Sequence, residues 1–103
     1  MSVPVEPLSW RDKVRLISEY SNILRDIERS VYELEESVRV IVGAGFVSDN
    51  IVKPLLQEAR KLQQMLQDLL LVVPSPIIRI RARELLDKTN NIISTINTAV
   101  KKR

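Results

Sequence analysis

Apolar residues recur along this chain in three long stripes, and this spacing constrains the fold more than any other feature. The first stripe has successive gaps of 4, 3, 3, 4, 3, 4, 3, 4 and 3 and consists of Trp10, Val14, Ile17, Tyr20, Leu24, Ile27, Val31, Leu34, Val38 and Ile41. A period near 3.5 residues is typical of a helix that packs along one seam against other helices. We therefore predict a helix at about 9–43, with Ser9 as N-cap and Gly43-Ala44-Gly45 at its end.

The second and third stripes alternate strictly between gaps of three and four. The second contains Val52, Leu55, Ala59, Leu62, Leu66, Leu69 and Val73. The third contains Ile78, Ala82, Leu85, Thr89, Ile92, Ile96 and Ala99. They predict helices at about 50–73 and 75–102. Pro54 is tolerated only near the first turn, so the second helix should begin between Ser48 and Lys53.

The segment LLLVVPSPIIRIRAREL, residues 69–85, allows three interpretations. A membrane span needs about 20 apolar residues, and the uninterrupted apolar run is only 69–73. A strand would fit the alternation of Ile and Arg over 77–81, but the helical period continues for six more turns. The third interpretation is a turn, in which Pro74 ends one helix, Ser75 caps the next and Pro76 takes its first position. We favour the turn.

Connections this short make neighbouring helices antiparallel. The predicted fold is all-α, an up-down-up antiparallel three-helix bundle with a long first helix. We assign residues 1–8, which contain two prolines, to an extended N-terminal arm, and residues 9–103 to a single helical-bundle domain. The residues predicted to be most buried are Leu24, Ile27, Val31, Leu34, Leu62, Leu66, Leu69, Leu85, Ile92 and Ile96.

The predicted first helix is longer than the second by about ten residues at 1.5 Å per residue. Its start should therefore overhang, and it carries Trp10, Val14 and Ile17. An uncovered apolar stripe usually implies another surface that covers it. Ile80 lies opposite the stripe of the third helix, on an outer face of mainly small polar residues, Asp87, Asn91, Ser94 and Thr98. We predict an oligomer interface that includes Trp10, Val14, Ile17 and Ile80.

Catalytic chemistry is disfavoured by composition. The chain has no His and no Cys, which removes the commonest general base, the commonest transition-metal ligand and any thiolate. Glu33, Glu35 and Glu36 cluster on the first helix, but the other stripes contain no acid, and Glu35 is spaced to pair with Arg39. We therefore expect no enzyme activity, catalytic residue, metal, cofactor or small-molecule substrate. The absence of Cys also favours an intracellular location.

Basic residues concentrate in the predicted third helix. Residues 75–103 carry a net charge of +5, with seven cations at Arg79, Arg81, Arg83, Lys88, Lys101, Lys102 and Arg103. These residues could bind nucleic-acid phosphates. They could instead compensate acids of the parallel first helix, with Arg79 to Arg83 beside Asp12 and Glu19, and Lys101 to Arg103 beside Glu33 to Glu36.

Two hypotheses of function remain. The first is a non-enzymatic helical interaction protein that self-associates or scaffolds a larger assembly, with a second copy or a helical protein as partner. The alternative is a small nucleic-acid-binding or nucleic-acid-coating accessory protein that uses the basic third helix. The stripes and the overhang favour the first hypothesis, because no aromatic residues are interleaved with the basic ones for base stacking.

Overall fold

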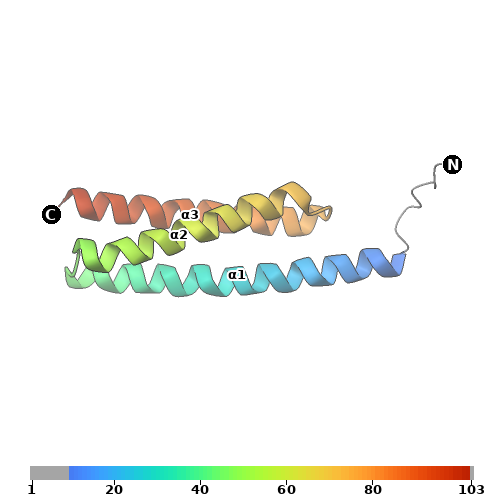
Figure 1. Ribbon diagram of the computed structural model, residues 1–103, viewed down its shortest axis with the longest axis horizontal. Helices are drawn as coiled ribbons and strands as arrows, with labels where there is room; N and C mark the ends of the chain where they lie inside the picture. Colours follow the sequence, from blue (N-terminus) through green and yellow to red (C-terminus); the bar gives the residue numbers. More distant parts are fainter. Residues whose placement is uncertain (1–9, 103) are drawn as a thin grey trace.

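The chain folds into three helices packed side by side. The computed structural model describes residues 10–102, which form α1 (Trp10–Ala44), α2 (Asp49–Val72) and α3 (Pro76–Lys101) and contain no strand. The chain passes up, down and up the bundle, so that α2 is antiparallel to both neighbours (Figure 1). The predicted three-helix bundle is confirmed, with each bound within one residue of its prediction. The predicted arm, residues 1–8, and the predicted N-cap Ser9 lie outside the described residues.

The connection between α1 and α2 depends on a glycine. Gly45 has a φ of 77°, in the left-handed region that side chains with a Cβ rarely adopt. This conformation lets the Phe46 N–H donate to the Ile41 carbonyl at 3.0 Å and the Gly45 N–H to the Val42 carbonyl at 3.2 Å. The two bonds form a Schellman motif, which satisfies carbonyls that the end of a helix would otherwise leave unpaired.

The connection between α2 and α3 is the predicted proline turn. Val73 is extended at the end of α2, Ser75 is the N-cap of α3 with φ −80° and ψ 123°, and Pro76 opens α3. Neither Ser75 nor Ser48, the N-cap of α2, makes a side-chain capping hydrogen bond. Pro54 lies in the second turn of α2, where the absence of its N–H leaves only one backbone bond unmade.

The three stripes meet in one core along the bundle axis. All ten residues predicted to be most buried are at most 6% exposed. The core also contains Thr89, which is fully buried and donates its hydroxyl to the Leu85 carbonyl at 2.8 Å. This bond within α3 satisfies the polar side chain that the stripes bring inside, and among residues 10–102 no buried side-chain donor or acceptor is left unpaired.

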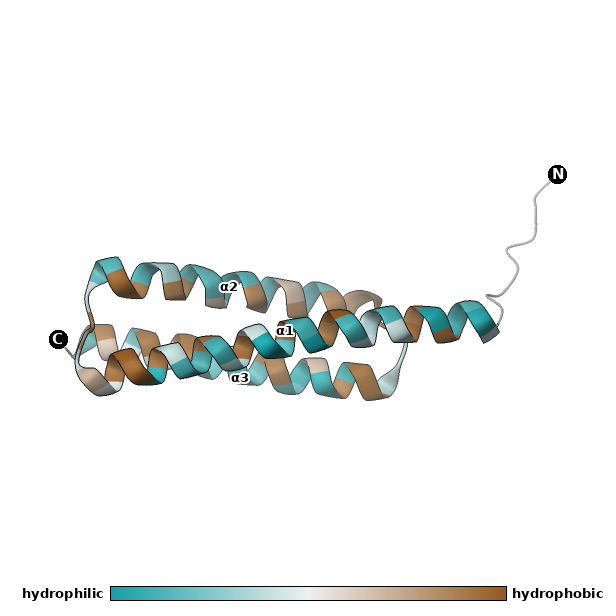
Figure 2. Ribbon diagram, turned by 90° about the horizontal axis from the view of Figure 1, so that it is seen from below, coloured by the Kyte–Doolittle hydropathy of each residue, from teal (hydrophilic) through white to brown (hydrophobic). Residues whose placement is uncertain are grey.

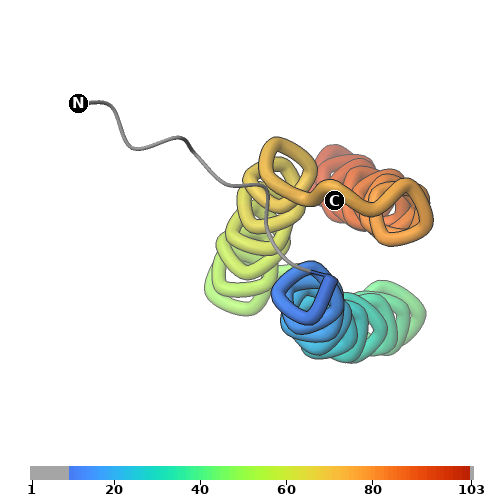
Figure 3. The backbone as a smooth tube through the Cα atoms, turned by 90° about the vertical axis from the view of Figure 1, so that its right-hand side faces the viewer, coloured from blue at the N-terminus to red at the C-terminus, as the bar shows by residue number. Residues whose placement is uncertain are grey.

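The helices contribute unequally to the bundle. Viewed end-on, they surround a common centre, with α2 beside both α1 and α3 (Figure 3). The most extensive contact is between α2 and α3, which are joined by the proline turn and by a hydrogen bond of 2.7 Å from the Gln63 amide to the Asn90 side chain. Apolar bands also continue along α1 beyond the ends of its neighbours (Figure 2).

Replacing Leu66 by Ala tests the core. Leu66 is fully buried, and its truncation should lower the free energy of unfolding by roughly 2–5 kcal/mol because a cavity replaces packed methyl groups. The control Gln67→Ala changes the exposed neighbour on the same helix and should alter stability by less than about 0.5 kcal/mol. Urea unfolding followed by circular dichroism measures both. A loss below about 1 kcal/mol for Leu66→Ala contradicts the core described here.

Candidate functional site: the apolar end of the bundle

The first turns of α1 extend past the rest of the bundle. α1 has 35 residues and α2 has 24. Lys13, Leu16 and Ile17 line a groove of about 350 Å³ together with Pro74, Ser75 and Pro76, so the turn between α2 and α3 lies beside this stretch of α1. The preceding residues of α1 project beyond the turn (Figure 1). Residues 10–17 are called the overhang below.

The overhang carries its apolar stripe into open surface. Trp10 is 70% exposed, Val14 57% and Ile17 41%, although the same stripe is buried from Leu24 onward. The spacing of the apolar residues along α1 is the same in its covered part and in the overhang. The difference in exposure therefore comes from the absence of neighbouring helices and not from a change in α1 itself. All three residues were predicted from sequence as parts of an interface.

Further exposed apolar residues surround the turn. Leu71 is 82% exposed, Ile77 73%, and Val72 and Ile80 59% each. Together with the three residues of the overhang they form a set that we call the apolar end: Trp10, Val14, Ile17, Leu71, Val72, Ile77 and Ile80. Exposed apolar residues also occur elsewhere among the described residues, for example Val40, Val42 and Phe46 near the α1–α2 connection. The three most exposed of those described, Leu71, Ile77 and Trp10, nevertheless lie at the apolar end, and a gathering of this kind is typical of an interaction site.

Sequence reasoning identified Trp10, Val14, Ile17 and Ile80 but missed the residues beside the turn. The sequence signal for Leu71, Val72 and Ile77 is weak. Each lies off the heptad stripe of its helix, but so do Leu70 and Leu86, which are partly buried against the core, so position off the stripe alone does not predict exposure.

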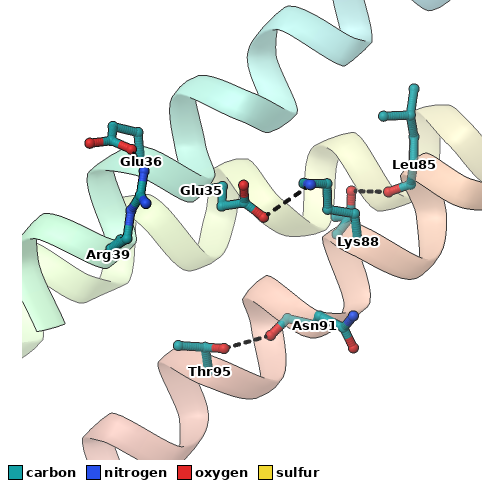
Figure 4. A network of polar contacts seen from close by, with 8 residues as sticks. Glu35, Glu36, Arg39, Leu85, Lys88, Asn91 and Thr95 are labelled. Atoms are coloured by element: carbon teal, nitrogen blue, oxygen red, sulfur yellow. Dashed lines mark hydrogen bonds and ion pairs between the residues drawn. The ribbon is translucent and has the colours of Figure 1, made fainter.

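Two of the predicted basic residues pair with acids of α1. Arg81 lies 2.6 Å from the Glu28 carboxylate. Lys88 lies 3.4 Å from the Glu35 carboxylate (Figure 4). Its ammonium also lies 4.6 Å from the centre of the Tyr32 ring. These pairs each join α1 to α3 one heptad apart, as flanking charges in parallel helices do. Because the side chains remain partly exposed, each pair stabilises the bundle only modestly.

The predicted partners of these cations were wrong. Arg79 to Arg83 had been placed beside Asp12 and Glu19, but Arg81 pairs with Glu28, 53 residues earlier. The prediction aligned the two helix starts, whereas the overhang displaces the start of α3 along α1. Arg81 lies opposite Glu28 and Lys88 opposite Glu35, which is an offset of 53 residues between α3 and α1. With the same offset, Lys101 and Lys102 lie beyond the end of α1 and not beside Glu33 to Glu36.

Arg79 has a structural contact. Its guanidinium donates to the Leu70 carbonyl at 2.5 Å and to the Val73 carbonyl at 3.4 Å. These carbonyls belong to the last turn of α2 and the residue after it, where a helix has unpaired acceptors and a negative partial charge. Arg79 therefore caps α2 from α3 and spans the proline turn.

Three of the remaining basic residues, unlike Arg79, Arg81 and Lys88, have no polar partner among the described residues. Within residues 10–102, the side chains of Arg83, Lys101 and Lys102 make no hydrogen bond or ion pair, and Arg103 lies outside the described part. Arg83 and Lys101 are 18 residues apart, which is five full helical turns, so they share one face of α3. These three side chains are the part of the predicted basic set that is free to meet an anion.

The acidic cluster of α1 is also occupied by local partners. Glu36, and not Glu35 as predicted, pairs with Arg39 one helical turn later, while Glu35 reaches Lys88 on α3 (Figure 4). No group of three carboxylates in the described range is arranged to hold a metal ion. Over the same range, no helix combines the length and the apolar character that crossing a bilayer requires.

The outer face of α3 is exposed and largely uncharged toward its C-terminal half. Asn91, Ser94 and Thr98 are exposed, and Thr95 turns its hydroxyl inward to the Asn91 carbonyl at 2.9 Å (Figure 4). Because none of these four residues is charged, this part of the face carries no charge of its own. It is the polar surface expected from the sequence.

The chain matches no family model, and no curated protein or solved structure is significantly similar to it.

Replacing Arg79 by Ala tests its capping role. The variant leaves two carbonyls at the end of α2 without their charged donor and should lose roughly 1–3 kcal/mol of stability. Arg83→Ala is the matched control, one turn later on the same helix and without a partner, and it should change stability by less than about 0.5 kcal/mol. Thermal and urea unfolding measure both variants. Equal effects would contradict the capping contact.

Proposed function

We propose that this chain is a non-enzymatic helical interaction protein that self-associates, or scaffolds a larger assembly, through its apolar end. The observation that carries the proposal is the overhang, an apolar helical stripe that continues past the core with its only tryptophan at the tip. A second copy of the chain is the partner we favour, and another helical protein is the next.

Trp10 and its neighbours on the stripe leave apolar surface in water that association could bury. A large aromatic side chain can bury about 150–250 Å², and apolar burial contributes about 25 cal/mol for each Å². Covering Trp10 and its neighbours on the stripe would therefore contribute several kcal/mol toward association. That gain can offset part of the entropy lost when two molecules become one.

The non-enzymatic part of the proposal is supported by composition. The sequence offers no Cys and no His, so a thiolate nucleophile and the base that most often activates a Ser or Thr hydroxyl are both missing. The absence of Cys likewise supports an intracellular location, which we propose on that ground alone.

A competing account of Trp10 is that residues 1–8 of the same chain cover it.

Nucleic-acid binding is the second candidate. It is supported by Arg83, Lys101 and Lys102, the three cations of α3 without partners among the described residues. It is less well supported than self-association because Arg79, Arg81 and Lys88 are engaged with groups of the bundle itself. Any such binding would rest on contacts to phosphates and not on stacking of bases.

Trp10→Glu tests self-association. A charge at the tip of the overhang should remove apolar contact and shift the protein to smaller particles. Phe46→Glu is the matched control, an aromatic residue 65% exposed at the opposite end of the bundle, and it should leave the mass unchanged. Light scattering coupled to size exclusion measures both across concentrations. In the unaltered protein, Trp10 fluorescence should shift to the red on dilution. A protein that stays monomeric at high concentration with Trp10 in an apolar environment favours the arm and contradicts the proposal.

Salt titration tests the second candidate. If α3 binds duplex DNA, affinity should fall by about one power of salt concentration for each phosphate contact. The triple variant Arg83→Gln, Lys101→Gln, Lys102→Gln should reduce that slope, whereas Arg25→Gln, Arg29→Gln, Arg60→Gln removes equal charge from α1 and α2 and should not. Fluorescence anisotropy with labelled duplex measures both. Lack of binding at low salt eliminates nucleic-acid binding.

A further inference from the structure

The groove of about 350 Å³ at the base of the overhang has apolar walls on two sides. One wall is formed on α1 by Leu16 and Ile17, and the other is formed in the turn by Pro74 and Pro76, with Ser75 between them. Leu16 is partly buried here although it lies off the heptad stripe of α1. Apolar surface that faces a groove from both sides favours an apolar occupant.

Lys13 is the charged residue in the lining of this groove. Within residues 10–102 its ammonium makes no ion pair, whereas the nearby Arg15 is paired with Asp12 at 2.6 Å. A single cation at the rim of an apolar groove favours an occupant that brings one carboxylate to the same point. The groove therefore suits a segment that is mainly apolar and carries one acid.

Residues 1–9, MSVPVEPLS, have this composition and are joined directly to the overhang. Most of their side chains are apolar, two are prolines, and Glu6 is the only charged side chain among them. Proline fixes its own φ and favours extended backbone in the residue before it, so less conformational entropy is lost when such a segment docks. Extended segments that contain proline are a recurring occupant of apolar grooves.

Distances along the chain place the one acid level with the one cation. From the start of α1, Lys13 lies about 4.5 Å and Leu16 about 9 Å along the helix. An extended segment advances about 3.1 Å per residue. If the chain reverses over residues 8–9, Glu6 lies about 6 Å and Val5 about 9 Å back along α1. Glu6 then comes to the level of Lys13, and Val5 to the level of Leu16.

We propose that residues 3–8 dock in the groove at the base of the overhang of the same molecule, with the Glu6 carboxylate paired to the Lys13 ammonium and Val5 packed on Leu16. The tether decides between this segment and an unattached partner. A segment tethered next to its site has an effective concentration in roughly the millimolar range, so it occupies the groove ahead of a free protein of similar affinity.

This docking goes beyond the proposed self-association and does not depend on it. Trp10 and Val14 do not line the groove, so the docked segment leaves both side chains to a second copy. Ile17 does line it, and docking removes part of that side chain from the apolar end. The docking also differs from the account in which residues 1–8 cover Trp10, because here they lie against the turn.

Disulfide formation between two introduced cysteines tests the docking, because the chain contains no Cys of its own. The test variant combines Val5→Cys with Ser75→Cys, which lies in the groove and makes no capping bond that the change would remove. The matched control combines Val5→Cys with Ser18→Cys, an exposed position next to Ile17 that faces away from the groove. A disulfide requires Cα atoms within about 7 Å of each other.

The measured quantity is the ratio of closed disulfide to open dithiol in a glutathione buffer, determined by alkylation of free thiols and mass spectrometry. The ratio should be higher in the test variant than in the control by roughly tenfold or more, because docking raises the local concentration of one thiol at the other. Equal ratios overturn the docking, since a segment without a preferred site reaches both positions. Disulfide-linked dimers in place of closed monomers place the segment in a second copy and also overturn it.

A charge exchange within the test variant examines the proposed ion pair. Adding Glu6→Lys should lower the disulfide ratio severalfold, because two cations then meet at the rim of the groove. Adding Lys13→Glu as well should restore the ratio, since the pair is complementary again. A ratio that does not respond to either change overturns the pairing of Glu6 with Lys13.

A nitroxide attached to Val5→Cys gives a second measurement that leaves residues 10–102 unaltered. It should broaden the amide resonances of Leu16 and Ser75 more than that of Ser18, and equal broadening overturns the docking. Light scattering of the unaltered protein tests self-association separately. A monomer with a high disulfide ratio at Ser75 overturns self-association alone, whereas an associating protein with equal ratios overturns the docking alone.

Discussion

The proline turn between α2 and α3 determines where the bundle ends. Pro74 cannot continue α2, and Pro76 is suited to the first position of α3, so the chain reverses within three residues. The unpaired carbonyls of α2 would be costly at this point, and Arg79 reaches back from α3 to two of them. Since α2 and α3 both stop here, the first turns of α1 have no neighbouring helix within the described part of the chain. The exposure of Trp10 is thus a consequence of a turn more than 60 residues later in the chain.

The inner part of the bundle uses the same stripe differently. From Leu24 onward the apolar residues of α1 meet those of α2 and α3, and the pairs Glu28–Arg81 and Glu35–Lys88 flank the seam one heptad apart. Burial of the stripes supplies most of the stability, because exposed ion pairs contribute little. The pairs instead agree with a single alignment of α1 and α3, in which the overhang extends past both neighbouring helices.

Local features were predictable from the sequence, and features that depend on alignment between helices were not. Helix bounds follow from Gly45, Pro74 and Pro76, whose backbone preferences act on their own neighbours, and the core follows from a period that each helix carries alone. The partner of Arg81 depends on how far α3 is displaced along α1, and no single helix contains that information. The exposed residues of the overhang were found because the difference in helix length can be counted. The groove beside the turn combines Leu70 of α2 with Ile80 of α3, and no single stripe predicts it.

The exposed residues of the apolar end lie at one end of the molecule, which bears on the size of any assembly formed through them. Surfaces at opposite ends of a molecule would join copies head to tail and extend without limit. A single surface that contacts its own copy about a two-fold axis is instead used up within a dimer. Under the proposed self-association, such a contact would leave Lys101 and Lys102, at the far end of the bundle, outside it. An assembly larger than a dimer would then require a different surface, and the uncharged face of α3 around Asn91 and Thr98 is the one that carries few charges to desolvate.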